Sequence, residues 1–165
     1  MICGVDCGQN GALALLDRLG APLQLVDMPA VKVKIGRTWR KRTDPHGLRA
    51  LLDEWRPAHV VIEEVSPRHG DGPRAVTLGI GYGEAVGVVV GMGLSLVIVP
   101  AAQWRRETGV SADNYDERKA KSLRVARDLF PSMAGRLKAA SHSDRAEALL
   151  IARWGLRARA LGVAA

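Results

Sequence analysis

The hydrophobic positions of residues 2–28 fall into three short runs separated by turn-forming residues. The runs are ICGVD at 2–6, GALALLD at 11–17 and LQLVDM at 23–28. Short apolar runs bounded by Gly, Asn and Pro are typical of β-strands, and such short links join neighbouring antiparallel strands. The pattern therefore predicts a three-stranded antiparallel meander.

Beyond this meander the pattern alternates between helical and strand periods. HVVIEEV at 59–65 and LSLVIV at 94–99 predict two buried strands. Helical spacing predicts helices over about 45–55 and 74–92, a short one from Pro100, one from Asp113 or Asn114 to Phe130-Pro131, and one over about 143–159. Gly70 to Pro73 is expected to form a loop. We expect an α/β fold, a mixed five-stranded sheet flanked by helices, with residues 1–165 as a single domain.

The net charge of the chain indicates a polyanionic partner. Against 24 Lys and Arg there are 17 Asp and Glu, so the net charge is +7. Arginine dominates, which suits phosphate recognition. Aromatic residues make up only 4% of the sequence, so stacking platforms for single strands would be sparse.

Much of the positive charge lies in one segment, VKVKIGRTWRKRT at 31–43, which contains no acid and carries Trp39. We expect a loop or hairpin extension and favour phosphate contact over a merely solvated hairpin. The basic residues of this segment are Lys32, Lys34, Arg37, Arg40, Lys41 and Arg42. A second candidate basic surface consists of Arg105, Arg106, Lys119, Lys121 and Arg124, although pairing with Asp116, Glu117 and Asp128 is an alternative.

Cysteine usage and hydropathy indicate the setting. Cys3 and Cys7 are four strand steps apart, roughly 13 Å, which is too far for a disulfide. Two free thiols indicate a reducing, cytoplasmic setting. Residues 75–104 are apolar, but glycines punctuate them, so we expect a buried helix and strand and no membrane span. No signal peptide is evident.

Acidic residues occur at the ends of predicted elements. Asp6 closes the first strand, Glu63 and Glu64 lie in the fourth, and Asp144 and Glu147 lie one turn apart on the last helix. Each has an ordinary explanation, such as a turn cap, an exposed strand end or a complement to the helix dipole. If the segments converge, cations must offset the like charges. Two Mg²⁺ or Mn²⁺ ions about 4 Å apart would then support phosphodiester hydrolysis.

Three of these segments carry a resemblance. GVDCGQNGALALLD, VVIEEV and HSDRAEALLIARW, in this order, resemble the ribonuclease-H-like superfamily and, within it, the phage-type branch of the RuvC-type Holliday-junction resolvases. The resemblance covers nearly the whole chain. It implies that Asp6, Glu63, Asp144 and Glu147 are catalytic metal ligands and that Lys119 lies near them. It also implies cleavage of four-way junctions or other branched DNA, with 5′-phosphate products.

The chain departs from the family pattern at some positions. Glu147 stands where many relatives carry Asp, and His142 precedes Asp144 by two residues. The loop at 66–74 lacks the aromatic residue that the bacterial enzymes place near the junction centre, so Arg68, His69 or Arg74 would serve there. This makes broad cleavage of branched structures an alternative to sequence-selective resolution.

The predicted helix at 74–92 has glycine every four residues, at Gly79, Gly83, Gly87 and Gly91. Helical glycine costs up to about 1 kcal/mol relative to Ala, so close packing on this face is expected to compensate. That packing could be intramolecular, against the sheet. The family resemblance instead implies that this helix lies in a homodimer interface.

Three other functions stay open from the sequence. An actin-like or sugar-kinase nucleotide-binding module shares the pattern from Asp6 to Gly11, but it needs a second lobe and a second phosphate loop, which 165 residues do not provide. A non-catalytic branched-DNA-binding protein would have no reason to keep all four acids. A ribonuclease H-type nuclease is barely distinguishable from a resolvase on sequence.

Overall fold

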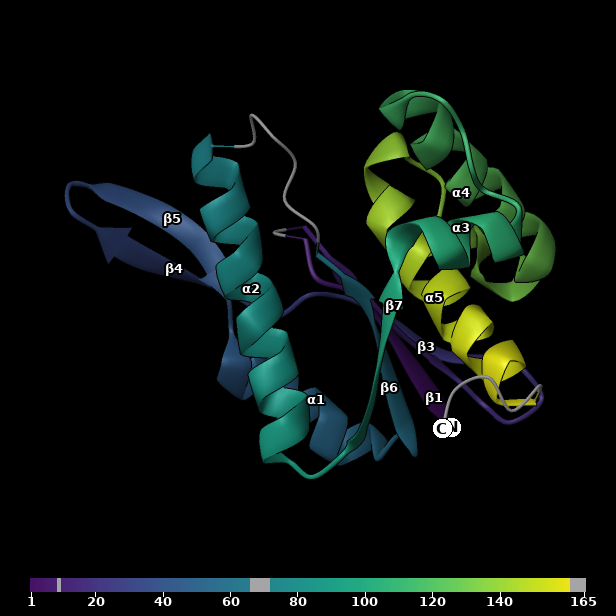
Figure 1. The fold of residues 1–165 in the computed structure, drawn as a ribbon, viewed down its shortest axis with the longest axis horizontal. Helices are drawn as coiled ribbons and strands as arrows, with labels where there is room; N and C mark the ends of the chain where they lie inside the picture. Colours follow the sequence, from purple (N-terminus) through teal and green to yellow (C-terminus); the bar gives the residue numbers. More distant parts are fainter. Residues whose placement is uncertain (9, 66–71, 161–165) are drawn as a thin grey trace.

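The structure is a computed structural model that describes residues 1–8, 10–65 and 72–160, except the side chains of residues 73, 74 and 160. Its centre is a five-stranded sheet in the order β3-β2-β1-β6-β7 (Figure 1). The strands of this sheet are β1 (Ile2–Asp6), β2 (Ala12–Leu16), β3 (Pro22–Asp27), β6 (His59–Glu64) and β7 (Ser95–Pro100). β1, β2 and β3 pair antiparallel, whereas β1, β6 and β7 pair parallel, so the predicted mixed sheet and its meander are confirmed.

Parallel pairing of β1 with β6 brings two of the acids to one edge. Val5 pairs with Ile62, so the next residues, Asp6 and Glu63, end neighbouring strands at the same level. Carboxyl ends of adjacent parallel strands meet at one edge of an open α/β sheet, where sites are usually formed. The buried apolar runs of both strands fix this register, because a one-residue slip would turn every side chain to the other face.

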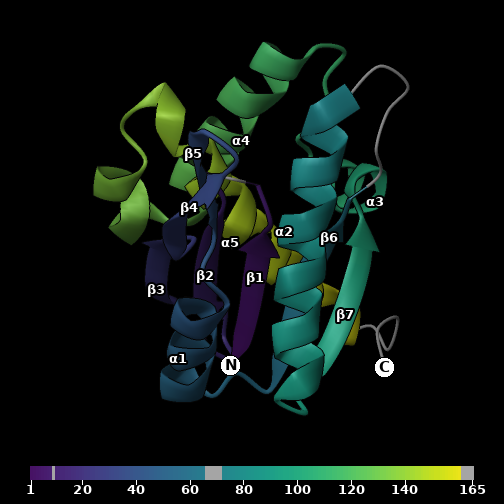
Figure 2. The same ribbon diagram turned by 90° about the vertical axis from the view of Figure 1, so that its left-hand side faces the viewer.

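Helices cover both faces of the sheet (Figures 1 and 2). One face and its core carry α3 (Ala101–Thr108), α4 (Tyr115–Leu129) and α5 (Ser143–Ala160). The other face and its core carry α1 (Pro45–Trp55) and α2 (Gly72–Gly91). The two 3₁₀ segments Pro131–Arg136 and Ala140–His142 connect α4 to α5 and were not predicted.

Glycine lets α5 approach the centre of the sheet. A Cβ at Gly4 in β1 would collide with the backbone of Ala148 and Ala152, and a Cβ at Gly155 would collide with Val61. Both helix and strands are buried at these contacts, so no exposed side chain could move aside. This close approach holds the first turn of α5 beside the end of β1.

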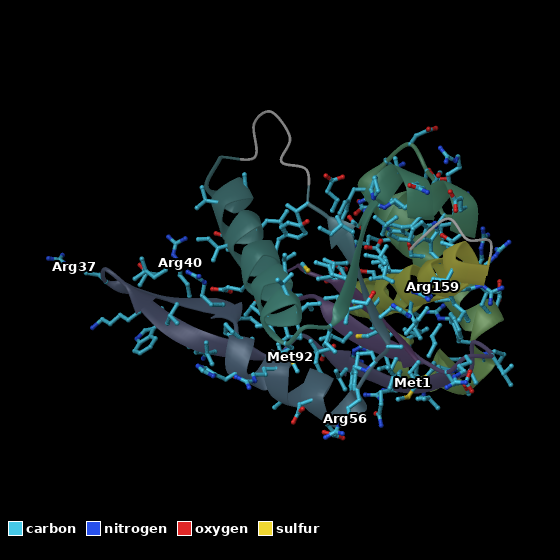
Figure 3. The ribbon with its side chains drawn as sticks, turned by 60° about the horizontal axis from the view of Figure 1, so that its bottom comes forward. Met1, Arg37, Arg40, Arg56, Met92 and Arg159 are labelled. Carbon is cyan, nitrogen blue, oxygen red and sulfur yellow. The ribbon has the colours of Figure 1, made fainter. Side chains whose placement is uncertain are left out.

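The basic segment forms a separate two-stranded ribbon, β4 (Ala30–Ile35) and β5 (Thr38–Thr43). It extends away from the five-stranded sheet beyond α2 (Figure 1), and Arg37 lies at its far end (Figure 3). The expectation of a hairpin extension is therefore confirmed. Thr43 at its base is buried.

Two local details differ from or settle the predictions. Gly72 and Pro73 belong to α2 and not to a preceding loop, because proline is compatible with the first helical turn. Asn114 is the residue that caps α4, since its side chain accepts a hydrogen bond from the backbone N–H of Glu117.

Cys3 and Cys7 are both free and buried. Among the described residues, no helix is long and apolar enough to cross a membrane.

Candidate active site

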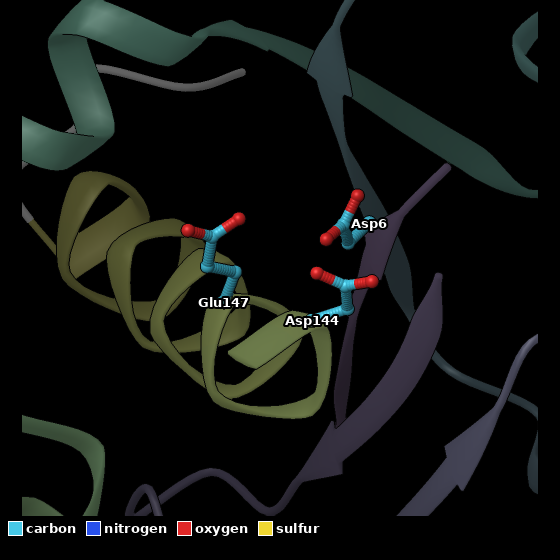
Figure 4. Close-up of side chains that lie close together, drawn as sticks. All are labelled: Asp6, Asp144 and Glu147. Atoms are coloured by element: carbon cyan, nitrogen blue, oxygen red, sulfur yellow. The ribbon is translucent and has the colours of Figure 1, made fainter. Parts of the chain in front are cut away.

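Three carboxylates converge where β1 ends and α5 begins. Asp6, Asp144 and Glu147 each offer one oxygen, and these oxygens lie within 4.8 Å of one another. In Figure 4 Asp6 comes from the end of β1, while Asp144 and Glu147 project from the first turns of α5 toward it. The spacing of three residues puts the two α5 acids on one face of the helix.

The turn after β1 orients Asp6. Its Oδ1 accepts a hydrogen bond from the backbone N–H of Gly8 at 3.2 Å. The backbone N–H of Gly11 in turn donates to the carbonyl of Gly8 at 2.7 Å, and a Cβ at Gly11 would overlap the Asp6 and Gly8 carbonyl oxygens. Glycine at position 11 is thus required by close backbone approach, and the tight turn holds the carboxylate of Asp6 at the end of β1.

Lys119 of α4 inserts its ammonium group between the two acids of α5. Its Nζ lies 2.6 Å from Oδ1 of Asp144 and 2.7 Å from Oε2 of Glu147. Ser122, one turn along α4, places its buried hydroxyl 3.3 Å from Oε1 of Glu147, and Ser143 places its own hydroxyl 3.3 Å from Oδ1 of Asp144. Glu147 is only 2% exposed, so its charge depends on these partners.

The raised pKa of Asp6 shows that negative charge is unfavourable in this cluster. Burial, followed by the charges of Glu147, Asp144 and Glu63, raises the pKa of Asp6 to about 8, although Lys119 opposes this shift. Burial also raises the pKa of Glu63, against the charge of Arg105. Burial alone would lower the pKa of Lys119, but Glu147 and Asp6 outweigh it and the pKa is raised. The site as a whole therefore favours added positive charge.

These properties fit a divalent cation. Asp6, Asp144 and Glu147 supply hard oxygen donors, which Mg²⁺ and Mn²⁺ prefer over nitrogen or sulfur. A cation at their centre would relieve the repulsion that raises the pKa of Asp6. The ammonium group of Lys119 already offsets part of the negative charge, since it pairs with two of the three acids.

Glu63 lies next to this group but is held by other partners. Its Oε2 accepts a hydrogen bond from Nε1 of Trp104 at 2.7 Å, and its Oε1 forms an ion pair with Arg105 at 2.9 Å. The three-carboxylate cluster does not include it. Its charge nevertheless raises the pKa of Asp6, so the two carboxylates are electrostatically coupled. Nothing in the local sequence indicates that Trp104 is a partner of Glu63.

Two other candidate residues, Glu64 and His142, do not belong to the cluster. Glu64 follows Glu63 in the strand and is exposed, as alternation along a strand requires. Nδ1 of His142 lies 3.3 Å from the backbone nitrogen of Ala139, so the imidazole accepts from the turn that precedes α5. His142 is therefore a cap residue of this turn.

An ion pair between distant segments anchors the start of α5. The guanidinium of Arg145 binds both oxygens of Asp27 in β3, with N–O distances of 2.6 and 2.7 Å. The hydrogen bond from Arg145 also lowers the pKa of Asp27. Because Arg145 follows Asp144 directly, this pair fixes the helix turn that carries the acid.

The predicted basic residues have different surroundings. On the ribbon, Arg42 pairs with Glu84 of α2 at 2.5 Å, and Nζ of Lys41 donates to Oδ1 of Asn10 at 3.2 Å. Four other basic side chains of the ribbon are exposed and make no such contact with the described residues, namely Lys32, Lys34, Arg37 and Arg40. Arg68 and His69 lie outside the described residues, and of Arg74 only the backbone is described.

The second basic surface does not form as one unit. Arg105 faces Glu63, Lys119 faces the acids of α5, and Lys121 donates to the carbonyl of Ser111 at 2.9 Å. Arg106 pairs with Glu107 at 3.6 Å, and Arg124 is exposed. In the part of the chain that is described, none of these cations pairs with Asp116, Glu117 or Asp128.

Comparison with known proteins identifies the fold. No family model matches the chain. Over 101 residues it is 34% identical to the chloroplastic Holliday junction resolvase MOC1 of Chlamydomonas reinhardtii, a match that covers 61% of this chain and 11% of that protein. The chain thus spans about a tenth of the length of this curated relative.

Solved structures match almost the whole chain. Thermus thermophilus RuvC in complex with a Holliday junction substrate has a TM-score of 0.67 at 18% identity, covering 99% of this chain and 96% of that chain. Fowlpox virus resolvase, in a complex with Holliday junction DNA, has a TM-score of 0.53 at 13% identity, covering 96% and 97%. The chain therefore has the ribonuclease-H-like fold of RuvC, as the resemblance of its sequence implies.

Proposed function

We propose that the protein is a metal-dependent, structure-selective DNA endonuclease that resolves Holliday junctions or other branched DNA by phosphodiester hydrolysis. The observation that carries this proposal is the convergence of Asp6, Asp144 and Glu147 within 4.8 Å on this fold. The relative and the solved structures named above, all junction resolvases by name or bound DNA, support it. Residues 1–165 would act as a single nuclease domain, built on the five-stranded sheet with the two-stranded ribbon as an arm.

Asp6, Asp144 and Glu147, with Glu63 as the fourth acid, would hold two Mg²⁺ ions, which Mn²⁺ could replace. When bound, such a pair activates water and stabilises the leaving 3′ oxygen, so that the products carry 5′ phosphates. The protein groups have distinct tasks in this reaction. The turn at Gly8 and the anchor at Asp27 keep two of the acids in place before substrate arrives.

Lys119 is expected to act in two states. Without metal, its ammonium group pairs with both Asp144 and Glu147 and offsets part of their negative charge. If the carboxylates held cations, Lys119 would be repelled from them, and its ammonium group would be free to contact a phosphate oxygen of the DNA. Its side chain is only 15% exposed, so any phosphate it contacts would lie at the cluster itself.

The ribbon residues Lys32, Lys34, Arg37, Arg40, Lys41 and Arg42 are the proposed contacts to a DNA arm, together with Arg68 and Arg74. The ribbon extends from the body of the protein as a two-stranded arm with no acidic residue (Figure 1). Such an arm adds phosphate contacts beyond those at the cleavage site, and it would make the binding strongly dependent on salt.

We further propose that two copies of the chain form a homodimer through α2. A Cβ at Gly79, Gly83, Gly87 or Gly91 would meet nothing within 4 Å, so intramolecular packing does not explain these glycines. They share one helix face with exposed apolar residues that are 37 to 64% exposed, namely Val76, Ile80 and Val90. A second α2 could approach this smooth apolar face closely, and the dimer would present two sites to two strands of a junction.

The experiment that tests the function compares labelled substrates in Mg²⁺ and in Mn²⁺. The panel contains a four-way junction, a three-way or flap structure, plain duplex and an RNA–DNA hybrid. Paired symmetric nicks in the junction are the expected result. Equal cutting of flaps would indicate a general debranching nuclease, and preference for the hybrid would indicate a ribonuclease H-type enzyme. Junction binding without any cutting would favour the non-catalytic alternative.

A further inference from the structure

The β4–β5 ribbon has two faces of different composition. Residues that pair across an antiparallel ribbon point to the same side, and successive residues alternate. Lys32 pairs with Lys41 and Lys34 pairs with Trp39, which places these four side chains on one face. We call this the lysine–tryptophan face. The other face carries Val31, Val33, Ile35, Thr38, Arg40 and Arg42.

The other face is turned toward α2. Arg42 forms its ion pair with Glu84 of α2. Ile35, Arg40 and Arg42 line, with Val76 and Ile80 among others, an open groove of about 510 Å³ between the ribbon and the helix. Lys41 also borders this groove, while its ammonium group bonds Asn10. The ion pair between Arg42 and Glu84 therefore holds this side of the ribbon toward α2.

Nothing in the described protein accounts for Trp39. The chain has four tryptophans, all among the described residues. Trp55, Trp104 and Trp154 are at most 6% exposed, whereas Trp39 is 64% exposed. The indoles of Trp104 and Trp154 donate to Glu63 and Glu107, but no hydrogen bond or ring contact is formed by Trp39 within the described residues. An exposed indole among lysines is a feature of surfaces that bind a partner.

The lysine–tryptophan face leads to the candidate active site. Its innermost residue, Lys41, donates to Asn10, which lies in the turn that follows Asp6. The positive charge of Lys41 also contributes to the lowered pKa of Asp27, the anchor of α5. Trp39 and Lys34 lie two residues farther out along the ribbon, roughly 7 Å away. A DNA strand that leaves the cluster along this face would meet Lys41 first and Trp39 next.

We propose that Trp39 is a base-stacking residue of the DNA interface, which packs its indole on a base exposed at a branch point while the lysines of the same face hold the phosphates. This inference rests on the proposed function and names the structural feature that is recognised. A plain duplex offers a free base face only at its ends, whereas a branch offers one at its centre. The indole can use any base, because every base has a π-face. Trp39 therefore selects branched DNA without selecting its sequence.

The test measures binding of a labelled four-way junction and a blunt-ended, hairpin-capped duplex without divalent metal, so that nothing is cut. Trp39→Ala should weaken junction binding roughly ten-fold and leave duplex binding nearly unchanged, and Trp39→Tyr should restore most of the affinity. The salt dependence should stay the same, since no charge is lost. Lys34→Gln should instead weaken binding to both DNAs and reduce the salt slope by about 0.9.

Two controls separate stacking from damage to the fold. Leu19→Ala removes another exposed apolar side chain, 93% exposed and at the opposite end of the sheet from Asp6, and should change nothing. In the unmutated protein, junction DNA should quench the fluorescence of the exposed indole and shield it from acrylamide, and the capped duplex should not. This signal requires no variant to fold.

Each other result overturns the inference. Unchanged junction binding by Trp39→Ala, equal losses on junction and duplex, or a Trp39→Tyr variant as weak as Trp39→Ala would exclude a stacking role. If the unmutated protein cuts junctions while Trp39→Ala binds normally, the role of Trp39 fails and the proposed function stands. If the unmutated protein neither binds nor cuts branched DNA, both fail.

Discussion

Nζ of Lys119 lies 2.7 Å from Oε2 of Glu147, and the same atom lies 2.6 Å from Oδ1 of Asp144. A single ammonium group thus pairs with both acids that α5 presents to Asp6 and offsets part of their negative charge. The side chain of Glu147 is 3% exposed, so water cannot replace this partner. Lys119 therefore stabilises the metal-free protein and competes with a cation for the same carboxylates.

Replacement of Lys119 should separate these two effects. Lys119→Met should lower the free energy of unfolding in EDTA by roughly 1–3 kcal/mol, because charged hydrogen bonds are lost. The same variant should gain more stability from added Mg²⁺ than the unmutated protein, because the competitor is absent. Thermal denaturation with and without Mg²⁺ measures both, and Lys119→Arg is the control that keeps the charge. An unchanged melting temperature in EDTA would exclude the neutralising role.

Asp6 should make the metal-free protein less stable as the pH rises. Its pKa is about 8 in the folded protein, above the ordinary value of 3.8, so between these values the folded state binds more protons than the unfolded state. Stability from this group is then present at low pH and is lost as pH rises through that window. Asp6→Asn should remove this loss and raise the melting temperature at pH 8 in EDTA by roughly 3 °C, about 1 kcal/mol. A lower melting temperature for Asp6→Asn would contradict the account.

Substitution of Glu63 tests whether this acid takes part in cleavage or only stabilises the fold. Glu63→Gln keeps an oxygen that can accept from Trp104 and removes the charge. If Glu63 acts with the cluster, as proposed, cleavage should fall by roughly 100-fold or more while the fold persists. Trp104→Phe removes only the indole donor and should cost roughly 10- to 100-fold in activity by releasing Glu63. Full activity of Glu63→Gln would restrict the active site to the other three acids.

The glycine face of α2 allows a dimer test that spares the monomer. Gly83→Leu places its side chain in open space and replaces a helical glycine, so the monomer should gain roughly 0.5–1 kcal/mol. A partner helix that approaches closely would collide with the leucine. Sedimentation or light scattering should show a dimer for the unmutated chain and a monomer for Gly83→Leu. Gly135→Leu, also in open space but outside α2, is the matched control. A dimer that survives Gly83→Leu would remove this face from the interface.

The sequence predicted the sheet because its strands are short apolar runs, whose character does not depend on distant residues. It also predicted that Asp144 and Glu147 share a helix face, since this follows from a spacing of three. The partners of these acids could not be predicted in the same way. Only the family resemblance indicates that Lys119 lies near the acids, and nothing local in the sequence indicates that it pairs with both of them.

Pairs that join distant segments depend on the three-dimensional packing. Arg145 binds Asp27 across 118 positions of sequence, and Trp104 donates to Glu63 across 41. Arg105 shows the same limit, since it was assigned to a basic surface but faces Glu63. Each pair forms because close packing of the helices on the sheet brings the groups together. A local sequence pattern does not indicate which distant groups will meet.

The most direct measurement of the central claim is strand-resolved cleavage of a labelled four-way junction by the unmutated protein and by Asp6→Asn, each with Mg²⁺ and with EDTA. The account predicts paired nicks with 5′ phosphates only for the unmutated protein in Mg²⁺. Asp6→Asn should bind the junction at least as tightly, because a negative charge is removed from the interface. Full-rate cleavage by Asp6→Asn, or cleavage in EDTA, would contradict a metal-dependent active site at these carboxylates.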